Sequence, residues 1–306
     1  MLKIGMIGLS EGNGHPYSFS AIINGYNRKY MKDSGWIGIY NYLNLKNESD
    51  FLLGKAQVTH VWTQNIEESK KISKATNIEH ICINYKDMIT KVDAVIIARD
   101  DYQSHYKIAK PFLEAGLAVF IDKPLSIDIE ELKYFLPYLK KSKLMSCAGL
   151  RYAKELDEIR ANKDTFGDIK LIRGAVVSSW EKYGIHMLDG IFSVIDFNVK
   201  SVFTTIGKHE SVLIKNFDNS IIQVDTLGNT VKTFQFDFWS EKSRFSAEVD
   251  DNFTAFRRTL FHFINMVEEG ISDIDSELTI NLMKILIAAR VSEKENREVY
   301  LDEIII

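Results

Sequence analysis

Short apolar runs alternate with amphipathic stretches between residues 1 and 124. The runs typical of buried strands are Leu2–Gly8, Val58–Trp62, Ile81–Ile83, Val92–Ala98 and Ala118–Ile121. Apolar residues at helical spacing lie between them, at Tyr17–Tyr26, 65–75 and Gln103–Ala115, where Gly116 is placed to cap the last helix. This alternation of strand and helix predicts a parallel, doubly wound α/β domain.

Residues 27–56 interrupt the pattern with Asn, Lys, Gly, Trp36 and several tyrosines, and we expect them to be irregular. Most doubly wound folds pass from the first helix to the second strand in a few residues. Two interpretations stay open: an inserted flap whose aromatic side chains cover a ligand, or a surface loop that buries its own side chains.

The second half of the chain has a different pattern. It begins with a predicted helix at Ile129–Lys140, a strand at Leu144–Ala148 and a helix that ends near Ala161. Closely spaced strands follow at Ile169–Val177, Val202–Ile206, Val212–Ile214, Ile221–Leu227 and Val231–Phe238. Turn residues such as Gly207 and Gly228 lie between them, so we expect antiparallel pairing. Two helices, Asn252–Glu269 and Glu277–Lys294, complete the chain.

A glycine-rich loop follows the first strand. Gly8 is followed by Ser10, Gly12, Asn13 and Gly14, and then by the predicted helix. Strand, glycine loop and helix form the dinucleotide-binding arrangement, because glycines let backbone N–H groups approach a pyrophosphate. The spacing departs from G-x-G-x-x-G, since Ser10 stands where the second glycine is expected. An ordinary strand-to-helix turn is the alternative.

Polar residues follow the other buried strands. The run Ala118–Ile121 leads into Asp122, Lys123 and Pro124, at the strand end where open α/β sheets keep their ligands. Pro124 restricts Lys123 and is a candidate for a cis bond. A solvated Lys-Pro turn is the alternative. The second strand ends at Thr63 with no acid or arginine after it, so NAD and NADP cannot be distinguished.

Composition narrows the possible classes of protein. The chain has 306 residues, 45% hydrophobic and 26% charged, which is normal for a soluble globular protein of two domains. A net charge of -4 gives no reason to expect nucleic acid as a partner. No apolar run is long enough for a membrane span, and residues 1–9 lack the pattern of a signal peptide. Cys82 and Cys147 lie in apolar runs, which favours buried free thiols and a reducing cytoplasm. We find no metal-ligand spacing.

The chain resembles the Gfo/Idh/MocA oxidoreductases, the glucose-fructose oxidoreductase and inositol dehydrogenase group. The likeness covers nearly the whole length and rests on motifs in their order. These are the Ile4–Leu9 start, Asp93–Ile97 with His105 downstream, Phe120–Pro124, Gly184–Asp189, Phe263-Ile264 with Glu269-Gly270, and Ala288–Ser292. The family pattern at the fifth strand is Glu-Lys-Pro, so Asp122 is a mild departure.

The resemblance implies a Rossmann dinucleotide-binding domain over residues 1–124. It implies a substrate-binding and oligomerisation domain over residues 125–306, with a large, mostly antiparallel open sheet. A nicotinamide cofactor (NAD or NADP) and a sugar, polyol or sugar-nucleotide substrate between the domains are expected. So are homodimers or homotetramers built through the open sheet.

Candidate site residues combine this resemblance with the strand-end positions. Hydride transfer at a carbinol carbon needs a proton acceptor and a donor that stabilises developing oxygen charge. We expect His186 and Lys123 to fill these roles. The candidates for cofactor binding are Gly8, Ser10, Gly12, Asn13, Gly14, Thr63, Ala98, His105 and Asp122. The candidates for substrate binding are Arg151, Lys182 and Tyr183.

Each candidate has a plainer alternative. His186 is also explained as a core histidine, Lys182 as a solvated helix lysine, His105 as a helix cap and Arg151 as a surface residue. Lys182 replaces an aspartate that the family usually has four residues before the histidine. This replacement favours a second hypothesis, a non-catalytic relative that binds a dinucleotide or sugar nucleotide.

Overall fold

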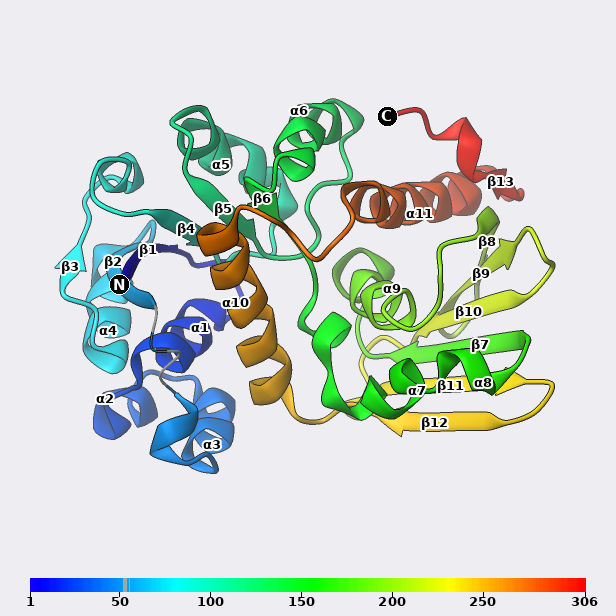
Figure 1. Cartoon of the computed structure of the whole chain (residues 1–306), viewed down its shortest axis with the longest axis horizontal. Helices are drawn as coiled ribbons and strands as arrows, with labels where there is room; N and C mark the ends of the chain where they lie inside the picture. Colours follow the sequence, from blue (N-terminus) through cyan, green and yellow to red (C-terminus); the bar gives the residue numbers. More distant parts are fainter. Residues whose placement is uncertain (52–53, 55) are drawn as a thin grey trace. The chain divides into compact units, whose positions relative to one another are not determined.

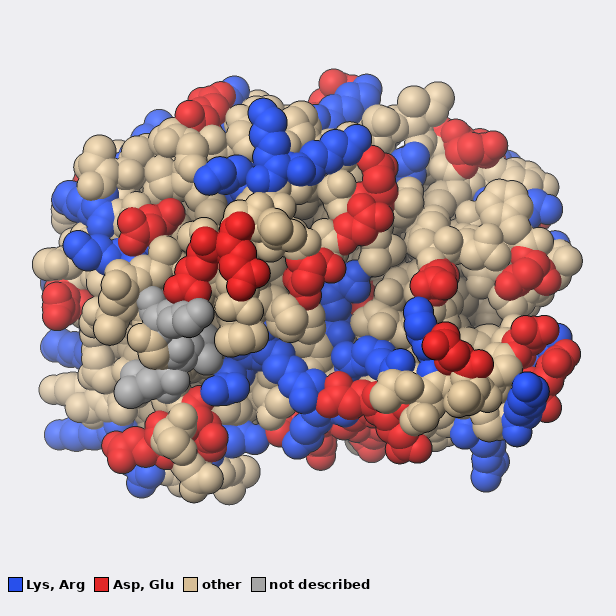
Figure 2. Space-filling view, viewed as in Figure 1, with Lys and Arg blue, Asp and Glu red and all other residues tan. Residues whose placement is uncertain are grey.

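The computed structural model describes residues 1–51, 54 and 56–306, and these form two compact units. Unit 1 comprises Met1–Ser126, Lys133–Ser146 and Phe256–Ser276, and unit 2 comprises Ile127–Leu132, Cys147–Ala255 and Glu277–Ile306. The chain therefore returns to unit 1 twice after residue 126. The predicted functional division at residues 124 and 125 stays a prediction. Figure 2 shows acidic and basic side chains interspersed over the visible face, in keeping with the small net charge.

The described part of unit 1 contains a six-stranded parallel sheet in the order β3-β2-β1-β4-β5-β6. Its strands are β1 (Leu2–Ile7), β2 (Ala56–Trp62), β3 (His80–Ile81), β4 (Ala94–Ile97), β5 (Ala118–Ile121) and β6 (Leu144–Met145). Every residue of β4 and β5 is buried, as the continuous apolar runs predict. The predicted Rossmann-like, doubly wound sheet is confirmed.

Helices flank this sheet (Figure 1). They are α1 (His15–Asn24), α4 (Ile66–Thr76), α5 (His105–Glu114), the unit 1 part of α6 (Ile129–Lys140) and the unit 1 part of α10 (Asn252–Glu269). Rings join α1, β5 and α10, because Phe120 lies 6.3 Å from Phe19 and 5.7 Å from Phe263 between ring centroids. These contacts make α10, which is distant in sequence, part of the core that supports β5.

The expectation that residues 27–56 are irregular is wrong for much of the segment. It contains α2 (Arg28–Lys32), α3 (Ile37–Asn44) and a 3-10 turn at Glu48–Asp50. Asn27 caps α2 by accepting hydrogen bonds from the N–H groups of Lys29 and Tyr30. The end of the segment, at 52, 53 and 55, lies outside the described residues. Neither helix has the apolar periodicity of a long element, which explains why the pattern did not reveal them.

The described part of unit 2 contains a seven-stranded sheet in the order β12-β11-β7-β10-β9-β8-β13. The strands are β7 (Ile169–Val176), β8 (Val199–Ile206), β9 (Glu210–Asn216), β10 (Ile221–Thr226), β11 (Phe234–Ser240), β12 (Arg244–Glu248) and β13 (Val299–Tyr300). Only the pairing of β7 with β10 is parallel among these strands. The prediction of a large, mostly antiparallel sheet is confirmed, although β12 and β13 were not predicted.

One face of this second sheet is covered by helices. They are α7 (Asp157–Ala161), α8 (Lys163–Phe166), α9 (Ile185–Ile191) and α11 (Ser276–Glu295) (Figure 1). An added Cβ at Gly190 would lie 2.5 Å from the Phe236 ring, so glycine is what lets α9 approach β11 closely. Cys82 and Cys147 are buried free cysteines, as predicted. None of the described helices combines the length and apolar character that a membrane span requires.

Candidate functional site

The carboxyl ends of β1, β4 and β5 bring three polar side chains together. The Ser10 hydroxyl donates to Asp100 Oδ1 at 2.5 Å, and it accepts from the Asp100 backbone N–H at 3.1 Å. Lys123 Nζ lies 3.7 Å from Asp100 Oδ2. Lys123 is only 4% exposed, so its ammonium is held at the strand end rather than in bulk water. The solvated Lys-Pro turn considered from the sequence is thereby contradicted, and the Lys123-Pro124 bond is cis.

A second cluster surrounds Asp122, the residue before Lys123. Its Oδ2 atom lies 2.5 Å from His15 Nδ1 and accepts a hydrogen bond from Asn13 Nδ2 at 3.1 Å. Its Oδ1 atom accepts from the Lys123 N–H at 3.0 Å. Burial acts to raise the pKa of Asp122, but the charges of His15 and Lys123 outweigh it and hold that pKa well below its ordinary 3.8. Asp122 is therefore a carboxylate that ties the glycine loop to β5.

Glycine is required at two positions of the loop after β1. A Cβ on Gly8 would lie 2.3 Å from Pro16 Cγ, so only glycine lets β1 approach the first turn of α1. Gly12 has φ +77°, in the left-handed region that favours glycine. Asn13 Oδ1 accepts from the His15 N–H at 2.8 Å and so closes the loop at the start of α1. Loop and helix start fit a pyrophosphate at the positive helix end.

The remaining cofactor candidates lie deeper in unit 1. Ala98 is fully buried, and Thr63 is 4% exposed and joins Ser69 and the Asn65 carbonyl through hydrogen bonds. His105 is fully buried, with its ring nitrogens 3.1 Å from the Leu125 carbonyl and 2.9 Å from the Arg99 carbonyl. Burial lowers the pKa of His105. Thr63 and Ala98 directly follow β2 and β4, and His105 begins α5.

In unit 2, the predicted active-site segment begins with a π-helical turn at Trp180–Gly184, and α9 follows directly. Lys182 therefore lies in the wider turn, four residues before His186, and is exposed. Tyr183 and His186 remain neighbours, with ring centroids 5.0 Å apart, and each is 6.0 Å from Phe234. π-helical turns occur frequently at functional sites.

Arg151 has a different environment from the one expected. It lies in the 3-10 turn Gly149–Tyr152, is 7% exposed, and its Nε atom is 3.4 Å from Asp189 Oδ1. Asp189 Oδ2 also accepts the Ala148 N–H at 2.7 Å. Burial raises the pKa of Asp189 to about 6, against the opposing effects of Arg151 and that N–H. The surface alternative is contradicted, because the pair anchors α9 from inside unit 2.

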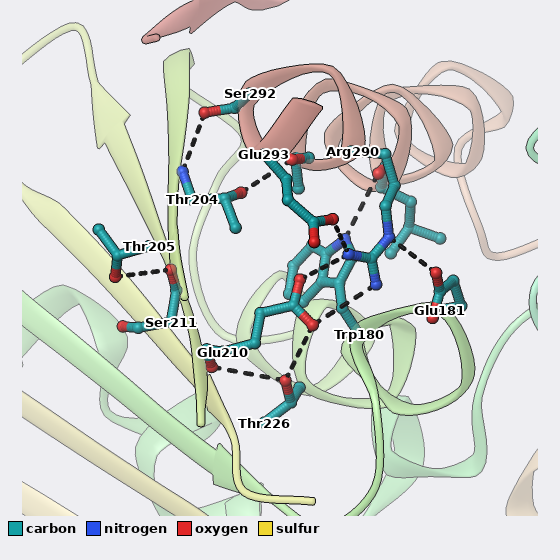
Figure 3. A network of polar contacts seen from close by, with 12 residues as sticks. Trp180, Glu181, Thr204, Thr205, Glu210, Ser211, Thr226, Arg290, Ser292 and Glu293 are labelled. Carbon is teal, nitrogen blue, oxygen red and sulfur yellow. Dashed lines mark hydrogen bonds and ion pairs between the residues drawn. The ribbon is translucent and has the colours of Figure 1, made fainter. Parts of the chain in front are cut away.

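Arg290 of α11 fastens the π-helical turn to the rest of unit 2 (Figure 3). Its Nε atom lies 2.9 Å from Glu181 Oε1, and its Nη1 atom lies 2.8 Å from Glu210 Oε1. Nη1 also pairs with Glu293. Trp180, fully buried, donates its indole N–H to the Leu286 carbonyl of α11 at 3.4 Å. One guanidinium thus connects the turn, β9 and α11.

A hollow of about 780 Å³ opens in unit 2 beside the π-helical turn. Tyr183 and Phe234, the ring neighbours of His186, are among its walls, together with Ser178, Asn229 and Lys232. Its volume falls within the roughly 300–1,000 Å³ of small-molecule sites. A second hollow of about 690 Å³, near Phe166 and Asn216, contains none of the candidate residues.

Sequence reasoning missed four residues of these clusters: Asp100, His15, Phe234 and Arg290. Asp100 follows the buried run Val92–Ala98 at the same sheet edge as Lys123, and this position was a usable signal. Nothing in the sequence paired Arg290 with Glu181, because their approach depends on the packing of α11. Among the residues that the structure describes, no group of three His, Cys, Asp or Glu side chains is arranged to hold a metal.

The fold and its strand-end clusters define a class: a two-unit α/β protein with a Rossmann-like sheet. Residues 34–149 match the Gfo/Idh/MocA family model, described as an oxidoreductase family with an NAD-binding Rossmann fold. The resemblance to Gfo/Idh/MocA oxidoreductases is thereby confirmed over residues 34–149.

Solved structures share the fold over the full chain. Scyllo-inositol dehydrogenase from Lactobacillus casei, with bound NAD(H) and scyllo-inositol, has a TM-score of 0.74 at 16% identity, covering 99% of both chains. Myo-inositol 2-dehydrogenase from Lactobacillus plantarum has a TM-score of 0.77 at 16% identity, covering 98% of this chain and 99% of that one. Myo-inositol dehydrogenase from Corynebacterium glutamicum has a TM-score of 0.76 at 13% identity, with the same coverage. No curated protein matches the chain.

Proposed function

We propose that this protein is an NAD(P)-dependent oxidoreductase that transfers a hydride to or from a hydroxyl or keto carbon of a sugar, polyol or sugar nucleotide. The observation that carries the proposal is the buried Lys123 ammonium beside Asp100 and the Asp122 cluster, next to the glycine loop. The family match and the inositol dehydrogenases of the same fold support it.

The residues of unit 1 suit the cofactor half of this reaction. The loop from Gly8 to Gly14, with Ser10 and Asn13, would hold the pyrophosphate, and Asp122 fixes the loop against β5. A bound nicotinamide would supply or accept the hydride. Lys123 would donate a hydrogen bond to the substrate oxygen and oppose its developing negative charge.

The residues of unit 2 suit the substrate half. His186 would take up or release the hydroxyl proton, because an imidazole changes charge near neutral pH. Tyr183 and Lys182 lie on the turn before it and would contact the substrate. Arg151, held by Asp189, would act by supporting α9.

Calorimetric titration with NAD⁺, NADH, NADP⁺ and NADPH tests cofactor binding, and cofactor reduction with inositols, sugars and sugar nucleotides tests the chemistry. We expect one pair of nucleotides to bind and at least one substrate to reduce the oxidised form. Folded protein that binds none of the four would contradict the proposal.

A non-catalytic relative is the second candidate. The exposed Lys182, in place of the aspartate that the family usually has, favours it. A protein of this kind would bind nucleotide or sugar nucleotide and give no cofactor reduction over the whole substrate panel.

We also propose a homodimer or homotetramer formed through the second sheet. We propose a cytoplasmic location, which the two free cysteines support.

A further inference from the structure

The hollow beside Tyr183 is lined by aromatic rings in one part and by polar side chains in another. Two aromatic rings, Tyr183 and Phe234, lie 6.0 Å apart between centroids at an interplanar angle of 34°. Hydroxyl and amide side chains make up much of the remaining wall, among them Ser178, Asn229 and Asn252. Aromatic faces with a few polar groups suit a hydroxylated ring, which offers C–H groups on its faces and hydroxyls at its edge.

The walls of this hollow are held in place by the backbone. Ser178 and Gly228 form an isolated antiparallel bridge, with N···O distances of 2.8 and 3.0 Å in the two directions. This part of the wall is therefore fixed before any ligand arrives, which limits the entropy lost on binding.

The formal charge of the hollow is positive. Among the described residues that line it, Lys232 is the sole Lys, Arg, Asp or Glu. The Lys232 ammonium lies 6.0 Å from the centroid of the Phe234 ring and forms no ion pair with a described residue.

Two acids next to the hollow form ion pairs with residues outside it. Glu181 pairs with Arg290 at 2.9 Å, and Asp251, next to Asn252, pairs with Lys154 at 2.6 Å. The balance of charge at the hollow therefore favours a negative ligand group.

We infer that this hollow binds a polyhydroxylated ring that carries an anionic group, with the ring against Tyr183 and Phe234 and the anion at Lys232. The inference rests on the proposed function and narrows its substrate class to acidic sugars. A ring carboxylate and a phosphate present the same chemistry to a lysine, as a point charge with hydrogen-bond acceptors.

Calorimetry with defined probes tests the inference. We would titrate the full chain with myo-inositol as the neutral probe, glucuronate as the carboxylate, and glucose 6-phosphate and UDP-glucose as the phosphates. At least one anionic probe should bind more tightly than myo-inositol, and only its affinity should fall at high salt. The stronger anionic probe identifies whether carboxylate or phosphate is the natural group.

Two lysine variants provide the matched comparison. Lys232→Gln should weaken the anionic probe roughly five-fold, as for an exposed ion pair, and leave myo-inositol unchanged. Lys200→Gln is the control, because Lys200 lies 6.0 Å from the Tyr300 ring in the same geometry, away from the hollow. Lys232→Arg should retain the preference. Equal affinity for neutral and anionic probes, or an equal loss in both glutamine variants, would overturn the inference.

The nucleotide titrations keep this test separate from the proposed function. Nucleotide binding with reduction by neutral polyols alone would leave the oxidoreductase proposal standing and remove the anionic substrate. Anion binding at Lys232 without any nucleotide binding would support the anionic ligand and contradict the oxidoreductase proposal. Absence of binding by every sugar probe would contradict the inference.

Discussion

Lys123 differs from an ordinary surface lysine in both burial and partner. Lysines are almost never fully buried without a partner, and here the partner is Asp100, itself hydrogen-bonded by Ser10. At 3.7 Å the contact with Asp100 is an ion pair that is longer than an ordinary hydrogen bond. A charge held in place before the reaction stabilises a developing oxyanion without reorganisation.

Substituting Lys123→Met should lower kcat by ~10²–10³, because one stabilising donor is removed while the aliphatic stem remains. Nucleotide affinity should be nearly unchanged, since the pyrophosphate loop keeps its contacts with Asp122. Steady-state kinetics and nucleotide titration measure the two effects. Activity within a few-fold of the parent would show that Lys123 serves only to end its strand.

The Asp122 carboxylate should make stability depend on pH in the acidic range. Its pKa is depressed in the folded state, so its stabilising contribution is complete above the ordinary value of 3.8 and is lost as pH falls below it. Asp122→Asn should lower the free energy of unfolding at pH 7. In this variant the free energy of unfolding should also fall less steeply between about pH 4 and 2 than in the parent. Urea unfolding across this range measures both effects.

Asp33→Asn is the control for this pH experiment, because Asp33 is an exposed carboxylate at the end of α2. It should leave the parental pH profile unchanged. Parallel profiles for Asp122→Asn and the parent would show that the cluster with His15 does not stabilise the fold.

At the scale of single residues, the sequence predicted where site residues lie better than it predicted the side chains they pair with. Lys123 and Asp122 were identified because a buried strand ends there, and strand ends of a parallel sheet meet at one edge. Their partners Asp100 and His15 lie at the same edge, but pairwise distances depend on the side-chain packing of the folded chain. His105 was assigned to the cofactor, yet both ring nitrogens face carbonyl groups in the interior.

At the scale of elements, the π-helical turn Trp180–Gly184 depends on Arg290 for its attachment. Arg290→Gln leaves Glu181, Glu210 and Glu293 close together without their shared cation. Because Arg290 is 24% exposed, we expect a loss of about 1–3 kcal/mol in the free energy of unfolding. Hydrogen exchange of the peptide from Trp180 to Ile191 should accelerate.

The matched control for this element is Arg297→Gln. Arg297 also pairs with two glutamates, Glu295 and Glu303, but it is 43% exposed and lies away from the turn. It should cost less than about 1 kcal/mol and leave exchange at the turn unchanged. Equal effects of the two substitutions would contradict a specific link between Arg290 and the turn.

Elements were predictable where their hydrophobic pattern was clear. The strands β1, β4 and β5 lie in apolar runs and the helices α10 and α11 are long, and the structure places each of them close to its predicted bounds. The two-residue strand β13 and the short helices α2 and α3 carry too few residues to show a period. The π-helical turn has no periodic signal either, because it widens one turn of an otherwise helical sequence.

At the scale of the whole molecule, the second sheet has one face that the helices of unit 2 do not cover. Ile221 and Leu171 are paired across β10 and β7, and Leu171 and Trp239 across β7 and β11. All three side chains are half-buried and form an apolar row. A row of this kind on the surface of a sheet is typical of an interface with a second copy.

The proposed oligomer should therefore depend on Trp239, at the end of this row. Trp239→Glu places a charge among apolar side chains of the partner, so we expect a shift from dimer or tetramer toward monomer. Sedimentation velocity measures the shift, and circular dichroism verifies that the variant is folded. Phe261→Glu is the control, since Phe261 is an aromatic residue that is 46% exposed on α10, in unit 1. A parent that sediments as a monomer, or a Trp239→Glu variant with the parental mass, would show that this face of the sheet has another purpose.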